Sequence, residues 1–575
     1  MNQNQGPLGD PRDTRNMFLA IALSIAVIIG WRQYVEIPQQ QQIAAAQQAE
    51  LAQPLAPPTA PAVTPTAPET VRPRAEVLAA GTRRELGNDS VHGSINLTGA
   101  RLDDITLTRY RETLDPTSPA ITLMSPSGTE MPYYAEFGWR ADGGIALPDQ
   151  NTPWQAAGTG KLEPGKPLVL HWNNGAGLVF EKKIELDDNY MFTITQSVRN
   201  ETQQSVILHP YGLVARAIDR KADANFLIHE GAVGVYDNKL HEDHYRDLEK
   251  ATLASRSTTG GWFGFTDKYW LVALIPDQKE SVATRTLYAN QVADNRFQAD
   301  YVGDGVTIAP GATQSSTAHL FAGAKEVRVL DGYSASLGIP HFDLAIDFGW
   351  FYFLTKPFFY ALDFLAKFLG SFGLAILAFT VIVKAFLFPL ADHAYFSMGK
   401  MKQLMPRLTE LRSMYANDPQ KQSQEIMALY KKEGVHPLSG CWPILIQIPI
   451  FFSLYKVLFV SIEMRHAPFY GWIHDLSAAD PSNLFTLFGH LDSPLLGVHI
   501  GILPILMGIT MWAQMKMNPP PTDQAQRIMF SLMPIIFTIS MAGFPVGLVI
   551  YWTWSNLLSI LQQYVIMRRM KVRAF

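Results

Sequence analysis

Hydrophobic and polar positions follow two different patterns along this chain. Between residues 77 and 340, short segments such as Leu178–Leu186 alternate apolar and polar residues and end at turn residues. Between 342 and 568 the apolar residues form long, nearly uninterrupted runs. Alternation is typical of strands with one face in water, whereas long apolar runs are typical of helices in lipid. The pattern therefore predicts a β domain and a separate helical membrane part.

The β domain has clear hairpin signals. Asp187-Asp188-Asn189 separates Leu178–Leu186 from Tyr190–Val198, and this arrangement predicts two antiparallel strands. We expect 77–340 to form one large β-sandwich. The aromatic residues Trp262, Phe263 and Phe265 could belong to a sugar site, but their alternation with small residues favours a place in the core.

Six apolar segments predict six membrane spans, one near the N-terminus and five after the β domain. They are 17–35, which resembles an uncleaved signal anchor, and 371–390, 441–460, 499–515, 528–543 and 546–567. The segments between them are a short N-terminus (1–16), a Pro-, Gln- and Ala-rich linker (38–76), a loop (461–498), a second loop (516–527) and a basic tail (568–575).

Basic residues predict the orientation of these spans. The connection 391–440 holds seven Lys or Arg residues, whereas 461–498 holds only Arg465. Basic clusters stay on the cytoplasmic side of a membrane. Both termini are therefore expected in the cytoplasm, and the β domain is expected in the opposite compartment.

The aromatic-rich segment 342–370 carries Lys356, Asp363 and Lys367 on one helical face. A narrow charged stripe on an apolar helix favours a position in the membrane interface. A short helix buried in the bundle is the alternative interpretation.

Lys384 is the one formal charge deep inside any of the six segments. A charge within hydrocarbon costs from about 2.5 to more than 10 kcal/mol, so such a residue usually faces protein or trapped water. The spans contain no Asp or Glu in their interiors, which disfavours a proton-coupled transporter. A lysine that only extends toward the lipid headgroups is the simpler interpretation.

The connection 391–440 has the periodicity of a helical hairpin. Met398, Met401 and Met405 recur at helical spacing, and Asp418-Pro419 predicts the start of a second arm that ends at Gly434. A methionine-rich face suits varied apolar partners, but it could equally form the seam between the arms.

Composition narrows the possible functions. The formal net charge of −4 and the lack of a basic, aromatic patch make direct nucleic-acid binding unexpected. The single cysteine, Cys441, cannot form a disulfide within the chain, and no histidine pair has the spacing of a metal site. We expect no metal or other cofactor.

Several segments together resemble the YidC/Oxa/Alb membrane protein insertase family. The resemblance covers almost the whole chain and is strongest in TVIVKAFLFPL (380–390), FPVGLVIYW (544–552) and the long segment 423–455. The segment GGWFGFTDKYWLVALIP (260–276) is similar to the periplasmic insertion of Gram-negative members, a supersandwich akin to sugar mutarotases.

The resemblance implies a bacterial inner-membrane insertase and chaperone that is not an enzyme. It implies a hydrophilic groove open to cytoplasm and lipid, lined by Lys384, Thr380, Gln447 and Trp552. Members more often have Arg where this chain has Lys384, which replaces a planar fork with a point charge. The hairpin around Met398, Met401 and Met405 matches the element that receives substrates. The implied partners are nascent membrane proteins, the Sec translocase, the ribosome or signal recognition particle receptor, and lipids.

Two other classes of protein remain open at this point. A secondary transporter would need inverted repeats and coupling carboxylates, and neither is apparent. A membrane-anchored carbohydrate-active enzyme would need its activity in the β domain.

Overall fold

The computed structural model describes residues 71–218, 228–251, 253–289, 296–434, 442–482, 500–519 and 524–571. The predicted anchor at 17–35, nearly all of the linker 38–76, Cys441 and the second half of the loop 461–498 lie outside these residues. The chain divides into two compact units, Met1–Pro57 with Pro520–Leu532 and Pro58–Pro519 with Met533–Phe575. Of the first unit, the structure describes only 524–532, which form the first half of one helix.

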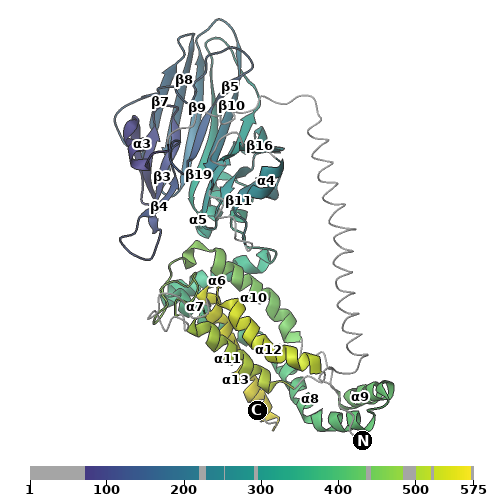
Figure 1. Cartoon of the computed structure of the whole chain (residues 1–575). Helices are drawn as coiled ribbons and strands as arrows, with labels where there is room; N and C mark the ends of the chain where they lie inside the picture. The colour runs from purple at the N-terminus through teal and green to yellow at the C-terminus, as the bar shows by residue number, and fades with distance from the viewer. Residues whose placement is uncertain are drawn as a thin grey trace. The chain divides into compact units, whose positions relative to one another are not determined.

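The β domain consists of two antiparallel sheets (Figure 1). The ten-stranded sheet has the order β1-β2-β3-β5-β10-β17-β16-β13, with β4 beside β3 and β18 beside β10. Its strands are β1 (Arg83–Gly87), β2 (Val91–Asn96), β3 (Arg101–Arg111), β4 (Ala120–Met124), β5 (Tyr133–Ala141), β10 (Val206–Ala217), β13 (Leu253–Thr259), β16 (Ser281–Ala289), β17 (Arg296–Gly303) and β18 (Val306–Ile308).

The nine-stranded sheet has the order β12-β11-β14-β15-β19-β9-β8-β7-β6. Its strands are β6 (Gln155–Ala156), β7 (Leu168–Asn173), β8 (Leu178–Leu186), β9 (Met191–Asn200), β11 (Gly231–Tyr236), β12 (Lys239–His244), β14 (Trp262–Thr266), β15 (Trp270–Ile275) and β19 (Thr313–Ala324). Two short helices, α3 (Arg74–Ala80) and α4 (Tyr245–Ala251), accompany the sheets.

The hydrophobic core explains why these segments are strands. Alternate residues of β8 are buried along its whole length, and Leu186 pairs with Phe192 across the predicted turn. Trp262, Phe263 and Phe265 of β14 are at most 1% exposed and belong to the main core. The predicted β-sandwich is therefore confirmed, and the aromatic residues are core residues as the sequence favours.

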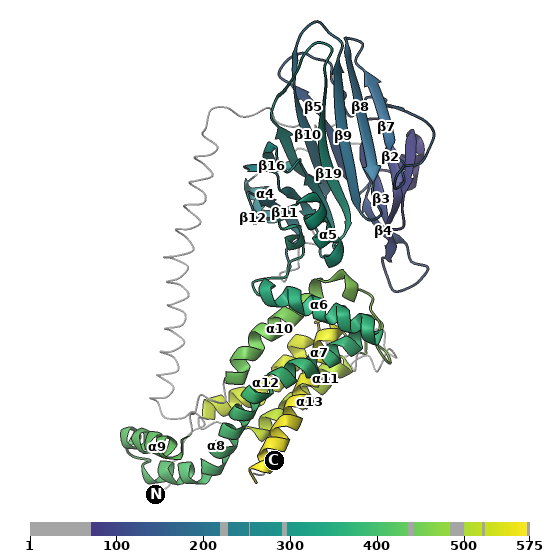
Figure 2. The same cartoon turned by 180° about the vertical axis from the view of Figure 1, so that it is seen from behind.

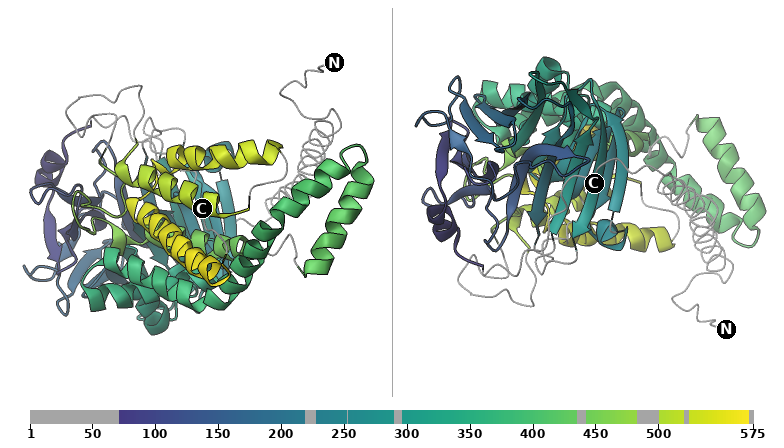
Figure 3. Two further views of the ribbon diagram at one scale, coloured as in Figure 1. Left: turned by 90° about the horizontal axis from the view of Figure 1, so that it is seen from below. Right: turned by 90° about the horizontal axis from the view of Figure 1, so that it is seen from above.

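The helical part follows the sandwich. It comprises α5 (Val327–Leu337), η3 (Phe342–Ala345), α6 (Tyr352–Leu369), α7 (Phe372–Phe386), α8 (Phe388–Met414), α9 (Pro419–Glu433), α10 (Trp442–Val460), η5 (Ile462–Met464), α11 (Ile502–Met517), α12 (Gln524–Met541) and α13 (Val546–Arg569). The last helix, α13, packs against α7, α8, α10 and α11, and it lies alongside α11 over most of its length (Figure 3).

The predicted span 371–390 is interrupted in the structure. The helix α7 ends at Phe386, and α8 starts at Phe388 after a bend of 67° (Figure 2). Pro389 explains the break, because a proline has no N–H to donate and its ring clashes with the carbonyl four residues earlier. Among the described residues, no single helix is both long and apolar enough to cross a membrane, and only this bent pair qualifies together. The six spans therefore stay a prediction.

The helix α6 has two chemically different faces. Lys356 donates to Asp331 (2.8 Å) and Asp343 (2.6 Å), while Asp363 pairs with Arg328 of α5 and with Lys367 (2.9 Å). The predicted charged stripe is thus ion-paired, largely to α5 and η3. Large aromatic residues of the same segment are exposed: Trp350, which precedes the helix, and Phe353, Phe364 and Phe368 of α6 are each 66% or more exposed.

A buried carboxyl group marks the start of α5. Glu463 of η5 accepts a hydrogen bond from the backbone N–H of Val327 (3.3 Å), and its second oxygen is buried with no partner among the described residues. Burial raises the pKa of Glu463 to about 7, and the neighbouring Glu326 and Asp363 act in the same direction.

This raised pKa predicts a pH-dependent stability. Between about pH 4.5 and pH 7 the folded state binds a proton that the unfolded state releases, so stability falls as pH rises through this window. We expect Glu463→Gln to be more stable than the wild type at pH 8.5, by up to about 3 kcal/mol at 1.36 kcal/mol per pKa unit, and equal to it at pH 4.5. Thermal midpoints of the full chain in nanodiscs measure the difference. Glu112→Gln, on the exposed surface, is the control and should change neither value.

Candidate functional site: a lysine-centred polar cluster

Lys384 lies in the last turn of α7 and points toward α13. Its ammonium donates to the hydroxyl of Ser559 (2.8 Å), which is 4% exposed. The amide of Gln562 donates to the backbone carbonyl of Lys384 (3.4 Å), and Tyr395 of α8 also hydrogen-bonds Ser559. Among the described residues, no carboxylate lies within 4.0 Å of the ammonium. We call Lys384, Ser559, Gln562 and Tyr395 the Lys384 cluster.

Lys384 has no carboxylate partner among the described residues, and in this it differs from the other lysine of the predicted spans. Lys456 of α10 forms an ion pair of 2.7 Å with Asp347. An ammonium has three N–H donors, and one N–H of Lys384 donates to the neutral hydroxyl of Ser559. The lysine therefore keeps donor capacity for another group.

A polar stripe along α13 continues from this cluster. Trp552, Asn556, Ser559 and Gln563 recur at three- and four-residue steps and so share one face of the helix. Asn556 donates to Thr510 of α11 (3.2 Å), and Gln563 donates to Asn518 (3.0 Å). These two amides join neighbouring helices, which is the usual role of such residues in a bundle.

Two other predicted groove residues, Gln447 and Thr380, make hydrogen bonds of different kinds. Gln447 of α10 donates to the hydroxyl of Tyr551 on α13. Thr380 is 1% exposed, and its hydroxyl donates to the carbonyl of Ile376 in its own helix (2.6 Å). Of the two, only Gln447 links its helix to α13, so Thr380 takes part through packing and not through a free hydroxyl.

Trp552 holds three helices together. Its ring makes edge contacts with Phe451 of α10 (centroids 4.6 Å apart) and Phe537 of α12 (5.2 Å). The same cluster includes Met507, Met541 and Val549. Trp552 is thus a packing centre beside the polar stripe.

Two methionines of the hairpin, Met401 and Met405, pack between its two arms. Leu404 and Leu408 of α8 form a small core with Ile426, Leu429 and Tyr430 of α9, and Met401 and Met405 pack against it. Met398 is not part of this core. Asp418 caps α9 by accepting from the N–H of Lys421 (3.0 Å), and Gly434 ends it with a positive φ of 62°.

Sequence reasoning missed Ser559, Tyr551 and Tyr395. Serine and tyrosine are common in helices, and only the seven-residue step from Trp552 to Ser559 signals that the two share a face. No metal site emerges either: in the described ranges, no three His, Cys, Asp or Glu residues come together as ligands.

Comparisons with known proteins agree across the whole chain. Family models described as "YidC periplasmic domain" and "60Kd inner membrane protein" match residues 83–361 and 364–573. The membrane protein insertase YidC of Methylobacterium nodulans is 49% identical to this chain, covering 98% of it and 96% of the relative. The chain belongs to the YidC family. The YidC of Bradyrhizobium diazoefficiens is 47% identical, with 98% and 97% covered.

A solved structure described as an active YidC insertase with its first transmembrane domain resolved is 17% identical. It aligns with 83% of this chain and 91% of its own, with a TM-score of 0.34. The assignment to the YidC family therefore rests on the sequence comparisons alone. They confirm the resemblance predicted from the sequence and assign the β-sandwich to the periplasmic domain of YidC proteins.

The packing role of Trp552 is testable. Trp552→Ala removes the partly buried ring that contacts Phe451 and Phe537, and we expect it to cost about 3 kcal/mol, the lower end of the range for aromatic residues in cores. We expect a lower thermal midpoint in nanodiscs and easier unfolding by denaturant. Leu561→Ala on the same helix is the matched control, because Leu561 is 57% exposed. Equal losses for the two variants would contradict the packing role.

Proposed function

We propose that this chain is a membrane protein insertase in which the Lys384 cluster receives the polar flank of an incoming hydrophobic segment. Family membership supports the insertase activity and disfavours the transporter and carbohydrate-enzyme alternatives. The observation that supports the site is the Lys384 ammonium, whose one described partner is the neutral Ser559 hydroxyl.

The chemistry of this lysine favours an acidic substrate group. A hydrogen bond between an ammonium and a carboxylate is about twice as strong as one between neutral groups. Because the described residues place no carboxylate beside Lys384, a carboxylate on the substrate would not compete there with another full negative charge. The contact would be brief, since the substrate moves on into lipid.

The groove itself is part of the proposal. Lys384, Gln447 and Trp552 each contact α13 or lie on it, so one helix connects three of the four predicted groove residues. Thr380 would act as a packed neighbour one turn before Lys384. No covalent step or nucleotide is required, because apolar side chains enter the bilayer favourably.

The membrane arrangement follows the same proposal. Six spans with both termini in the cytoplasm agree with the distribution of basic residues. The exposed aromatic face of α6 suits the lipid interface, while the ion pairs of its other face attach it to α5. The protein would then lie in the inner membrane, as the family description indicates.

The hairpin of α8 and α9 is the proposed receiving element for substrates. Met401 and Met405 stabilise its seam, whereas Met414 and Met427 are 62% and 63% exposed. An exposed, flexible thioether suits changing apolar partners. The proposed protein partners are the Sec translocase and the ribosome or signal recognition particle receptor.

Substitutions at Lys384 test the charge. We expect Lys384→Ala to slow insertion of a substrate with an acidic translocated tail about tenfold, which corresponds to about 1.4 kcal/mol of a charge-assisted hydrogen bond. Lys384→Arg should retain activity, because the charge is kept. Insertion into proteoliposomes, measured by protection of the tail from protease, gives the rates.

Two controls separate charge from folding. A substrate with the same hydrophobic segment and a neutral tail should be inserted equally well by Lys384→Ala and the wild type. Lys239→Ala removes an exposed charge of the β domain and should have no effect on either substrate. If Lys384→Ala inserts the acidic substrate at the wild-type rate, the charge has no role. Crosslinking of a stalled nascent chain to probes at 384, 447 and 552 tests whether substrate passes these residues.

A further inference from the structure

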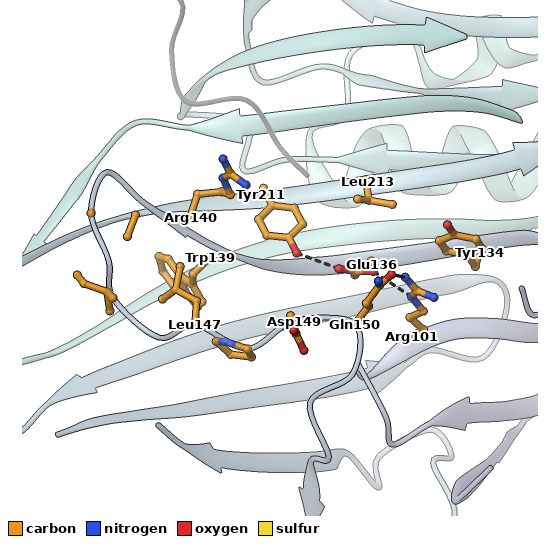
Figure 4. Close-up of a pocket in the computed structure, with 14 residues that line it drawn as sticks. Arg101, Tyr134, Glu136, Trp139, Arg140, Leu147, Asp149, Gln150, Tyr211 and Leu213 are labelled. Carbon is orange, nitrogen blue, oxygen red and sulfur yellow. Dashed lines mark hydrogen bonds and ion pairs between the residues drawn. The ribbon is translucent and has the colours of Figure 1, made fainter. Parts of the chain in front are cut away.

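The β domain contains a cavity that the insertase function does not explain. It has a volume of 470 Å³ and lies among β3, β5, β10 and the loop that follows β5 (Figure 4). This volume falls within the range of small-molecule sites, about 300–1,000 Å³. Its walls carry both charged and aromatic side chains, chiefly Arg101, Glu136, Trp139, Arg140, Asp149 and Tyr211.

Part of this lining is held in place by its own interactions. Glu136 is 7% exposed and accepts from Nε of Arg101 (2.9 Å) and from the hydroxyl of Tyr211 (2.9 Å). Arg101 also donates to Gln150 of the loop that follows β5 (2.9 Å). Each oxygen of Glu136 thus has one donor, and these bonds hold this part of the lining in place.

Two other charged groups keep free hydrogen-bonding capacity. Nε of Arg140 is buried and has no partner among the described residues. Asp149 uses one oxygen, Oδ1, to accept from the N–H of Asn151 (2.9 Å) and the hydroxyl of Thr152 (2.9 Å). In the described part of the chain its Oδ2 has no assigned donor. The cavity therefore offers a cationic donor and an anionic acceptor together.

The inner end of the cavity has unmet polar groups as well. A small extension of 10 Å³ shares Glu136, Trp139 and Asp149 with the main cavity and is also lined by Trp154, Lys182 and Gln196. Nε1 of Trp154 and Oε1 of Gln196 are buried and lack partners in the described residues, although these side chains are only 7% and 3% exposed. Buried polar atoms normally have partners. The space suffices for about one water or one hydroxyl group.

We propose that this cavity binds a neutral polyhydroxylated molecule, a saccharide of one or two rings. A hydroxyl group both donates and accepts, so neighbouring hydroxyls can satisfy Arg140 and Asp149 at once. A simple anion would be repelled by Asp149, and a simple cation by Arg140. Trp139 and Tyr211 are each only 3% exposed, so they shape the wall of the cavity, and hydrogen bonds from its polar groups would provide most of the binding.

The site binds and does not catalyse. The buried carboxylate of the lining, Glu136, already accepts from Arg101 and Tyr211, one donor on each oxygen, which disfavours a role as a general base. The inference is independent of the insertase role, because none of these residues belongs to the helical part.

Binding to the full chain in nanodiscs tests the proposal, since detergents with sugar headgroups would compete. The probes are maltose, N-acetylglucosamine and methyl β-D-galactoside, with inorganic phosphate and the tripeptide Gly-Ser-Ala for comparison. We expect saturable binding of at least one sugar, with a Kd of about 1 mM or below, by saturation-transfer NMR. Asp149→Asn and Arg140→Gln should each weaken it tenfold or more.

A matched control is available in another loop. Asp115 accepts from the N–H and hydroxyl of Thr117 much as Asp149 accepts from its own loop, but it does not line the cavity. Asp115→Asn should bind the sugar like the wild type. Asp149 is in an exposed loop, so Asp149→Asn should fold and still test sugar binding even if Arg140→Gln fails to fold. No sugar binding up to about 50 mM, equal binding by Asp149→Asn, or binding of phosphate or the tripeptide in place of sugar would overturn the proposal.

Discussion

Polar atoms among apolar helices must find partners inside the protein, because hydrocarbon offers none. The arrangement of the helical part follows from this constraint. The helix α13 carries several polar side chains, and its neighbours supply the partners: Tyr551 meets Gln447 of α10, Asn556 meets Thr510 of α11, and Ser559 meets Lys384 of α7. In the first two pairs both groups are neutral. Of these three pairs, only the one with Lys384 joins an ionisable amine to a neutral partner, and this difference sets Lys384 apart from the purely structural pairs.

The same principle separates the two faces of α6. Its charged residues pair with Arg328 and Asp331 of α5, a helix whose residues Val327 and Leu330 are buried in the main hydrophobic core, and with Asp343 of η3. Its large aromatic residues stay exposed. A charged stripe alone suggests a solvated face. The ion pairs show that the stripe attaches α6 to α5 and η3.

Local features of the fold could be predicted from the sequence. The strand Leu178–Leu186 matches β8 residue for residue, and the cap at Asp418 follows from side-chain chemistry within one turn. Features that depend on distant residues could not. Ser559 is 175 residues from Lys384, and the stripe of α6 gains its meaning only from α5. Pro389 was visible in the sequence, but the bend of 67° depends on how α8 packs. The cavity was invisible because it combines β3, β5, β10 and a loop whose spacing follows no motif.

The break at Leu387 has an electrostatic consequence for Lys384. A helix carries about half a negative charge at its C-terminal end, and the effect fades within one turn. Because α7 ends at Phe386, Lys384 lies inside that last turn. If α7 and α8 formed one continuous helix, the negative end would lie about 40 Å away at 1.5 Å per residue. The interruption thus leaves the last carbonyl groups of α7 near Lys384, although the positive N-terminal end of α8 begins at Phe388 and offsets part of their charge. What remains is a weak, partial counter-charge, which a whole carboxylate arriving from outside would exceed.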